Sequence, residues 1–338
     1  MIVKNNINAV TIKDVAKKAG VSASTVSRAL SNGAKVSEDI KQRVISAAVE
    51  LNYEPNMAAQ MLKGSKQKAI GLIMPNVNNV MFPQTVKGIE DEAFINGYSL
   101  MICNTGENNF VEEQYVDSFM RRSIDGIIFM TAQINNTKIL DLHKKDFPVI
   151  ALNRHIPDTT DAVVLDNYWS GYKVTDYLLS KGIKKIAYFD GWHYLDLYQQ
   201  RVKAARARLQ ESGLYIDDKM YYKDLDALDD GYMAAKDLFA NGHRPEAVIA
   251  ASDLKAIGII KALHELKISI PQDVSVISFD NIDIAQWITP SLTTMAQPFY
   301  KMGRGACKRL LERIESKIPL KERVYKLRGD LIIRDSVI

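Results

Sequence analysis

Residues 11–30 read Thr11-Ile-Lys-Asp-Val-Ala-Lys-Lys-Ala-Gly-Val-Ser-Ala-Ser-Thr-Val-Ser-Arg-Ala-Leu30 and predict two short helices joined by a tight turn. Thr11 and Asp14 have the spacing of a capping box, and apolar residues then recur at helical spacing. Gly20 is suited to end this helix, and Ser22 can cap a second one. The arrangement indicates a helix-turn-helix, a motif whose second helix enters the major groove of DNA.

The second helix carries five residues that would face base edges or phosphates, namely Ala23, Ser24, Thr25, Ser27 and Arg28. Arg28 alone among them has the forked donor that suits guanine O6 and N7. A third helix is expected from Ser37 to about Asn52. By pattern alone, a three-helix bundle with incidental surface polarity remains the alternative to DNA binding.

The charge of the chain is unevenly distributed. Residues 1–68 contain eleven Lys and Arg against five acids, a net charge of +6, whereas the whole chain of 338 residues is only +4. The remaining residues therefore carry a net charge of −2. A basic N-terminal fifth on a slightly acidic body is typical of a small nucleic-acid-binding module attached to a larger domain.

The overall composition, 47% hydrophobic and 25% charged, is that of a globular protein and excludes disordered, collagen-like and disulfide-scaffold classes. We find no apolar run long enough for a membrane span and no signal-peptide pattern, so we expect a cytoplasmic protein without a membrane partner. Cys103 and Cys307 both lie in apolar patterns and are expected to be small buried side chains.

The segment after the third helix reads as a hinge. Pro55 disfavours helix at the preceding residue, and Met57–Gly64 is helix-competent but too short to be stable alone. Leu62 and Lys63 could belong to a plain linker, or could supply an apolar wedge and a cation for the minor groove. We therefore divide the chain into a helical head (1–54), a linking segment (55–68) and a body (69–338).

The body, from residue 69 onward, alternates apolar runs with helix-length segments, which is the pattern of doubly wound parallel sheets. The expected strands are Ala69–Met74, Leu100–Cys103, Gly126–Met130, Val149–Leu152, Ala162–Leu165, Ile186–Phe189, Ala247–Ala251 and Val274–Phe279. Eight or more strands in about 270 residues favour two lobes, with ligands bound beyond the carboxyl ends of the strands.

Signatures of catalysis and of metal binding are missing from the sequence. There is no phosphate-binding loop or dinucleotide fingerprint, and the five histidines lack metal-ligand spacing. The acidic run Asp224–Asp230 resembles a calcium loop, but the twelfth position is Ala235 rather than a glutamate. We expect no enzyme activity, no metal and no cofactor.

The head and hinge resemble the lactose-repressor (LacI/GalR) family of transcription regulators, through residues 11–30 and Tyr53-Glu-Pro-Asn-Met-Ala-Ala-Gln-Met-Leu62. The resemblance implies a homodimer that places two heads on a pseudo-palindromic double-stranded DNA operator. In this family, paired hinge helices open the central base step with a leucine, matched here by Leu62. The implied DNA-binding residues are Thr11, Ala23, Ser24, Thr25, Ser27, Arg28, Asn56, Ala59, Leu62 and Lys63.

The resemblance continues through the body, in Pro75–Phe82, Val163–Asn167, Pro245–Leu254, Ile270–Asn281 and Pro290–Thr294. It implies a two-lobed, periplasmic-binding-protein-like body that closes on an effector. The family resemblance thus implies that the three parts of the chain are a helix-turn-helix DNA-binding domain (1–54), a hinge helix with linker (55–68), and an effector-binding and dimerisation domain (69–338). Lobe 1 would comprise about 69–165 and 293–325, and lobe 2 about 166–292 and 326–338. The implied effector-binding residues are Phe82, Asp166, Arg201, Ser252 and Asp280, to which we add Trp192 as a stacking candidate that could equally be a core residue.

Each effector residue also has a plainer interpretation. Asp166 could simply cap the following helix, Arg201 could lie on a solvated face, and Asp280 could belong to a turn. Trp169 and Trp287 are further stacking candidates that could equally be core residues. An aromatic ring with carboxylates and an arginine suits a polyhydroxy ligand, although a purine would use a similar set.

We therefore expect a DNA-binding transcription regulator, a repressor of carbohydrate-utilisation genes, whose operator affinity is switched by a sugar effector. A nucleoside or purine effector, or a protein corepressor, is an alternative within the same family. A solute-binding protein would fit the body but not the basic helical head, and a sugar-converting enzyme would need a catalytic base or phosphate loop that the sequence lacks.

Overall fold

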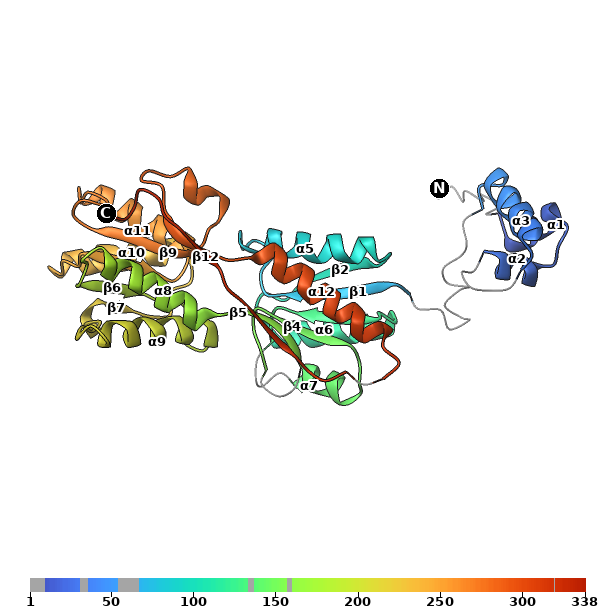
Figure 1. Cartoon of the computed structure of the whole chain (residues 1–338), viewed down its shortest axis with the longest axis horizontal. Coiled ribbons are helices and arrows are strands. Elements are labelled where there is room, and N and C mark those ends of the chain that lie inside the picture. The colour runs from blue at the N-terminus through green and yellow to red at the C-terminus, as the bar shows by residue number, and fades with distance from the viewer. Residues whose placement is uncertain (1–9, 31–35, 54–66, 133–136, 157–159, 319) are drawn as a thin grey trace, which may run out of the picture. The chain divides into compact units, whose positions relative to one another are not determined.

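The computed structural model describes residues 10–30, 36–53, 67–132, 137–156, 160–318 and 320–338. The chain divides into two compact units, the head (Met1–Gln67) and the body (Lys68–Ile338). Figure 1 shows helices alone in the described part of the head and alternating strands and helices in the body. No helix in the described ranges is long and apolar enough to cross a membrane. These same ranges hold no group of three or more His, Cys, Asp or Glu that could bind a metal ion.

The head contains the three helices that the sequence predicts, α1 (Ile12–Ala19), α2 (Ala23–Ala29) and α3 (Glu38–Glu50). Their inner faces share one small core. It is formed by Val15, Ala16, Ala19, Val26, Ala29, Val44, Ala47 and Ala48. Alanine dominates this core, so the three helices can approach closely.

The body is built on two six-stranded sheets. The first has the strand order β11-β5-β4-β3-β1-β2, and the second β12-β10-β9-β8-β6-β7. The first sheet comprises β1 (Ala69–Met74), β2 (Ser99–Asn104), β3 (Gly126–Phe129), β4 (Val149–Leu152), β5 (Asp161–Leu165) and β11 (Val324–Leu327). The second comprises β6 (Ile186–Phe189), β7 (Tyr221–Tyr222), β8 (Ala247–Ala250), β9 (Ser275–Asp280), β10 (Thr293–Ala296) and β12 (Asp330–Ile332). Within the described residues, neighbouring strands pair in parallel except β10 with β12, which are antiparallel.

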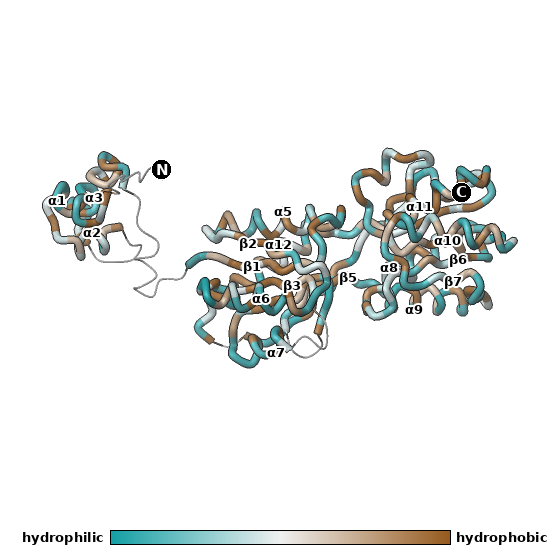
Figure 2. Tube along the Cα trace, turned by 180° about the vertical axis from the view of Figure 1, so that it is seen from behind, coloured by the Kyte–Doolittle hydropathy of each residue, from teal (hydrophilic) through white to brown (hydrophobic). Residues whose placement is uncertain are grey.

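Helices cover both faces of each sheet. The helices of lobe 1 are α5 (Phe82–Ile95), α6 (Asn109–Arg121), α7 (Thr137–Lys144) and α12 (Phe299–Glu315). Those of lobe 2 are α8 (Asn167–Ser180), α9 (Asp196–Gln210), α10 (Leu228–Ala240) and α11 (Asp253–Glu265), with short 3-10 turns at Asp218–Met220 and Asp283–Gln286. Figure 2 shows apolar strands, such as β1, between these helices. Alternate residues of a strand enter separate cores on its two faces, as Leu72 and Ile73 of β1 do, which explains the near-continuous apolar strands in the sequence.

The chain passes three times between the sheets, and two of these crossings lie a few residues later than predicted. The first follows Leu165, as expected. Thr293–Ala296 pairs with β9 in the second sheet, so the return expected near Thr293 comes after Ala296. Val324–Leu327 pairs with β5 in the first sheet, so the last crossing follows Leu327 rather than Tyr325. Both differences arise because a short strand completes its sheet before the chain leaves it.

The prediction for the cysteines is also only half correct. Cys307 is buried on α12, whereas Cys103 is only partly buried, because β2 is the edge strand of the first sheet.

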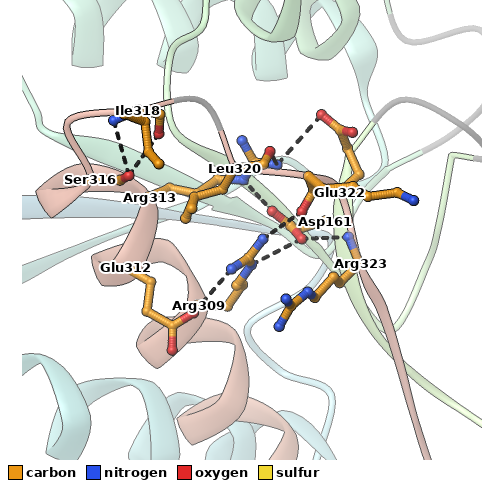
Figure 3. A network of polar contacts seen from close by, with 10 residues as sticks. Asp161, Arg309, Glu312, Arg313, Ser316, Ile318, Leu320, Glu322 and Arg323 are labelled. Atoms are coloured by element: carbon orange, nitrogen blue, oxygen red, sulfur yellow. Dashed lines mark hydrogen bonds and ion pairs between the residues drawn. The ribbon is translucent and has the colours of Figure 1, made fainter.

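A buried ion network joins α12 to the start of β5 (Figure 3). Asp161 has no exposed surface and pairs with Arg309, at 3.0 Å, and with Arg313. The main-chain N–H of Arg323 donates to the same carboxylate at 2.7 Å. One acid therefore holds together the helix that enters lobe 1 and the strand segment that leaves it.

Candidate functional site

Local contacts define both ends of α1 and the start of α2. The backbone N–H and hydroxyl of Thr11 donate to Asp14 at 2.8 and 2.6 Å. Gly20 ends α1 in the left-handed region, at φ 65°, where a side chain would be strained. The Ser22 hydroxyl then accepts the N–H of Thr25 at 3.1 Å and starts α2. Gly20 and the Ser22 cap therefore define the turn between the two helices of the motif.

Helix α2 buries one face and exposes the other. Val26 and Ala29 are buried, whereas Ser24 and Arg28 are exposed one turn apart, and Arg28 Nε donates to the Ser24 carbonyl at 3.4 Å. Thr11 is exposed, and the other predicted contacts on this helix, Ala23, Thr25 and Ser27, are partly buried. Asn56, Ala59, Leu62 and Lys63 lie outside the described residues.

The body contains a cavity of about 270 Å³ lined by residues of both lobes, here called the interlobe cavity. Several lining residues directly follow strands, such as Asn76 after β1, Asn153 after β4 and Ala251 after β8. The carboxyl ends of the parallel strands in both sheets therefore face this space, where ligands bind in doubly wound folds. Five predicted effector residues line it, namely Phe82, Trp192, Arg201, Ser252 and Asp280.

Arg201 is buried, with 3% of its surface exposed, and its guanidinium is held by hydrogen bonds to two other segments. Its Nε donates to Asn167 Oδ1 at 2.9 Å and its Nη1 to the Ala251 carbonyl at 3.0 Å. The guanidinium also lies over the Phe279 ring, 4.4 Å from the centroid. Gly171 of α8 allows this placement, because a Cβ there would lie 2.3 Å from the main-chain oxygen of Arg201.

Asp280 lies at the end of β9 with an unusual backbone conformation, φ 115°. The Gln297 amide donates to its Oδ1 at 3.0 Å. Burial raises the pKa of the Asp280 carboxyl to about 7, against the opposing effect of the Arg201 guanidinium. Strain and a raised pKa in one cavity-lining residue are features of functional sites rather than of ordinary turns.

Asp166 does not line the interlobe cavity, and its contact with the effector stays a prediction. Its Oδ1 accepts the N–H of Trp169 at 3.0 Å and caps α8, and its Oδ2 accepts from Arg328 at 3.0 Å. It lines an adjacent cavity of about 630 Å³, which shares Asn153, Arg154, Leu195 and Leu197 with the interlobe cavity. Trp287 is 77% exposed and Trp169 packs partly against the core of lobe 2, so neither stacking candidate lies in the interlobe cavity.

Sequence reasoning missed several residues of this cavity. Glu107 and Arg154 form a two-pronged ion pair, one arm of which measures 2.9 Å between Arg154 Nη1 and Glu107 Oε2. Tyr198 and Lys255 also line the cavity. Lys255 follows Ser252 by one helical turn on α11, so its position near that residue could have been inferred from helical spacing.

Comparisons with known proteins match both units. Residues 11–56 match the LacI family of bacterial regulatory proteins, and residues 175–337 match a periplasmic binding protein-like domain. The chain is 32% identical over 330 residues to the HTH-type transcriptional repressor PurR of Vibrio vulnificus, covering 97% of this chain and 98% of that protein. It is also 32% identical over 332 residues to the HTH-type transcriptional regulator RegA of Clostridium saccharobutylicum, covering 98% and 100% of the two chains.

Solved structures agree on the fold. The lac repressor dimer bound to operator and the anti-inducer ONPF superimposes with a TM-score of 0.87 at 22% identity, covering 97% of this chain and 99% of that one. An uncharacterized protein from Actinobacillus succinogenes superimposes with a TM-score of 0.73 at 30% identity, covering 80% and 99%. The named relatives are transcription regulators rather than enzymes. The chain belongs to the LacI family of bacterial regulatory proteins and is a DNA-binding transcription regulator.

Proposed function

We propose that this regulator is a repressor whose affinity for its operator is set by a small polyhydroxy effector, a sugar or sugar derivative, bound in the interlobe cavity. One observation carries the proposal: a single cavity gathers Phe82, Trp192, Arg201, Ser252 and Asp280 from two lobes joined by three chain crossings. A ligand that contacts both lobes stabilises one angle between them over others.

The cavity lining suits hydroxyl groups on a compact ring. Asn76 and Asn79 offer amide donors and acceptors from lobe 1, while Arg201 and Asp280 offer a donor and an acceptor from lobe 2. Phe82 and Trp192 can cover the apolar face of a sugar ring. Polar groups around a few aromatic rings are what a carbohydrate requires.

The path from the cavity to the DNA passes through β1. This strand begins at Ala69, directly after the head, and its main-chain N–H donates to Asp125 at 3.1 Å. The same strand ends at Met74, next to the cavity-lining Pro75 and Asn76. In this proposal, a change in lobe angle alters the spacing of the two hinge segments, so DNA and effector influence each other reciprocally.

We also propose a homodimer formed in part by lobe 1. The edge strand β2 and the end of α5 expose apolar side chains, including Phe94 at 76%, Ile95 at 73% and Ile102 at 48%. An unpaired edge strand beside exposed apolar residues is suited to pairing with a second copy. A dimer would present two heads to two half-sites.

The proposal is tested in two steps. Duplexes selected from a random pool by the full-length protein define the operator, and a thermal-shift screen of sugars, sugar acids, sugar phosphates, polyols, nucleosides and purines identifies ligands. We expect a ligand that raises the melting temperature and changes operator affinity, with both effects weakened by Arg201→Ala and unaffected by Lys203→Ala on the exposed face of α9. Ligands that bind without changing operator affinity, or that tolerate Arg201→Ala, would contradict the proposal.

A further inference from the structure

Lys255 is a buried cation of the interlobe cavity, and the proposed function gives it no role so far. It occupies the third position of α11 and its side chain lines the interlobe cavity, yet it is 1% exposed. Its Nζ donates to the Asp226 carbonyl at 2.8 Å and to the Ser252 hydroxyl at 3.4 Å. No carboxylate among the described residues is close enough to form an ion pair with it, although the more distant carboxyls of Asp280, Asp226 and Asp190 act to raise its pKa. Lysine is almost never fully buried without such a pair.

A second buried cation lies beside it. Arg201 and Lys255 approach the same Tyr198 ring, at 5.8 and 5.5 Å from its centroid. The Nη2 of Arg201 makes no hydrogen bond to the described part of the chain, and no carboxylate there pairs with Arg201. Each cation therefore keeps donor capacity that protein atoms do not use.

The N-terminus of α11 adds to this positive potential. Ser252 is its N-cap and lines the cavity, so the partial positive charge of the helix end lies near the Lys255 ammonium. A lysine in the first turn of a helix is electrostatically unfavourable on its own. Burial lowers the pKa of Lys255, which reflects the same cost of holding this charge away from water.

The nearby acids do not compensate for these charges by direct pairing. Asp190 accepts the Gly191 N–H and the Tyr221 hydroxyl, each at 2.8 Å, and Asp280 accepts from Gln297. Burial raises the pKa of both carboxyls, so each is held nearer to its neutral form than an exposed acid. A third acid, Asp226, lines the same side of the cavity, but it is exposed and Lys255 contacts its main-chain carbonyl. No acid that the structure describes on this side therefore forms an ion pair with either buried cation.

We propose that the effector carries an anionic group, a carboxylate or a phosphate, which binds between Lys255 and Arg201 at the N-terminus of α11. This assignment rests on the proposed function and narrows its ligand class to sugar acids or sugar phosphates. The anion supplies a negative charge in direct contact with the two cations, which no carboxylate of the described residues provides. The ring hydroxyls of the effector then face Asn76 and Asn79 across the cavity. A neutral sugar would leave both buried cations without a counter-ion.

The test uses the full-length chain and matched pairs of probes. Glucuronate, galacturonate, gluconate and glucose 6-phosphate are each compared with neutral glucose or galactose by thermal shift and calorimetric titration. At least one anionic probe should bind about tenfold or more tightly than its neutral parent. Tighter binding of the sugar acids would identify a carboxylate as the anionic group, and tighter binding of glucose 6-phosphate would identify a phosphate.

Variants then assign the effect to Lys255. Lys255→Met should weaken the anionic probe about tenfold or more, Lys255→Arg should retain most of the binding, and Lys203→Met, an exposed charge removal on α9, should change it little. Equal weakening of neutral and anionic probes by Lys255→Met would overturn the proposal. The wild-type comparison of neutral and anionic probes decides the question even if Lys255→Met does not fold.

Two further outcomes separate this inference from the proposed function. If neutral sugars or purines bind and regulate while the anions do not, the anion site is refuted and the effector-controlled repressor stands. If no probe in the wider screen binds, both proposals are contradicted, and a protein corepressor becomes the favoured explanation.

Discussion

Asp280→Asn should stabilise the protein, and the gain should grow with pH. The pKa of about 7 in the folded state lies about three units above the usual value of 3.8, and each unit corresponds to about 1.4 kcal/mol. Ionised Asp280 therefore destabilises the folded state by about 4 kcal/mol above pH 7. An asparagine carries no charge and keeps the Oδ1 acceptor that Gln297 uses.

The direction of the pH dependence follows from the raised pKa. Between about pH 4 and pH 7 the folded state retains a proton that the unfolded chain has released, so wild-type stability falls as pH rises through this window. The advantage of Asp280→Asn should therefore increase by about 2–3 kcal/mol from pH 5 to pH 8. In melting temperature this is about 5 °C, at about 2 °C per kcal/mol for a domain of this size.

The assay compares thermal midpoints of wild type and variant, without ligand, at pH 5 and pH 8. Asp226→Asn is the matched control, because Asp226 lines the same cavity but is exposed. Its effect on the midpoint at pH 8 should be smaller than that of Asp280→Asn, because an exposed carboxylate loses little hydration on folding. An advantage of Asp280→Asn that does not change with pH, or a variant less stable than wild type at pH 8, would refute the reasoning. If the stabilised variant also loses effector binding, Asp280 lowers the stability of the fold but is needed for ligand binding.

Three other predictions concern the ion network and the DNA. Asp161→Ala leaves the buried Arg309 and the partly buried Arg313 without their acid and should lower the stability of the body by about 3–5 kcal/mol in thermal or urea unfolding. Asp141→Ala, at an exposed ion pair, should cost less than about 1 kcal/mol, and equal losses would contradict the role of burial. Arg28→Ala should relax base preference at one position per half-site by about 1–3 kcal/mol in binding assays with operator variants, whereas uniform weakening on all sequences would make Arg28 a phosphate contact. Leu62→Ala should weaken operator binding but not effector binding, and unchanged operator affinity would exclude the wedge.

The sequence predicted the helical head and most strands because short-range patterns determine them. Capping residues and a left-handed glycine mark the ends of α1 and α2, and all eight predicted apolar runs form strands. The four strands that were missed lack this signal. Tyr221–Tyr222 is two residues long, and Val324–Leu327 is largely exposed and half polar, so pairing with a distant strand rather than local pattern makes each of them a strand.

The sequence predicted only those cavity residues that can be identified from their own type and their neighbours along the chain. Phe82, Arg201 and Asp280 were found in this way. The partners that place them, such as Asn167 for Arg201 and Gln297 for Asp280, come from other elements and are visible only after folding. For Asp166 the sequence left two roles open, a helix cap and a ligand contact, and the structure shows the cap.

The close approach of Gly171 to Arg201 has a consequence for genetics. Gly171 lines none of the cavities described above, yet any side chain there would displace the backbone that carries the guanidinium. A selection for regulators that still occupy their operator but no longer respond to the effector should therefore return changes at position 171 as well as at position 201. Effector-blind alleles would map to a helix that never touches the ligand.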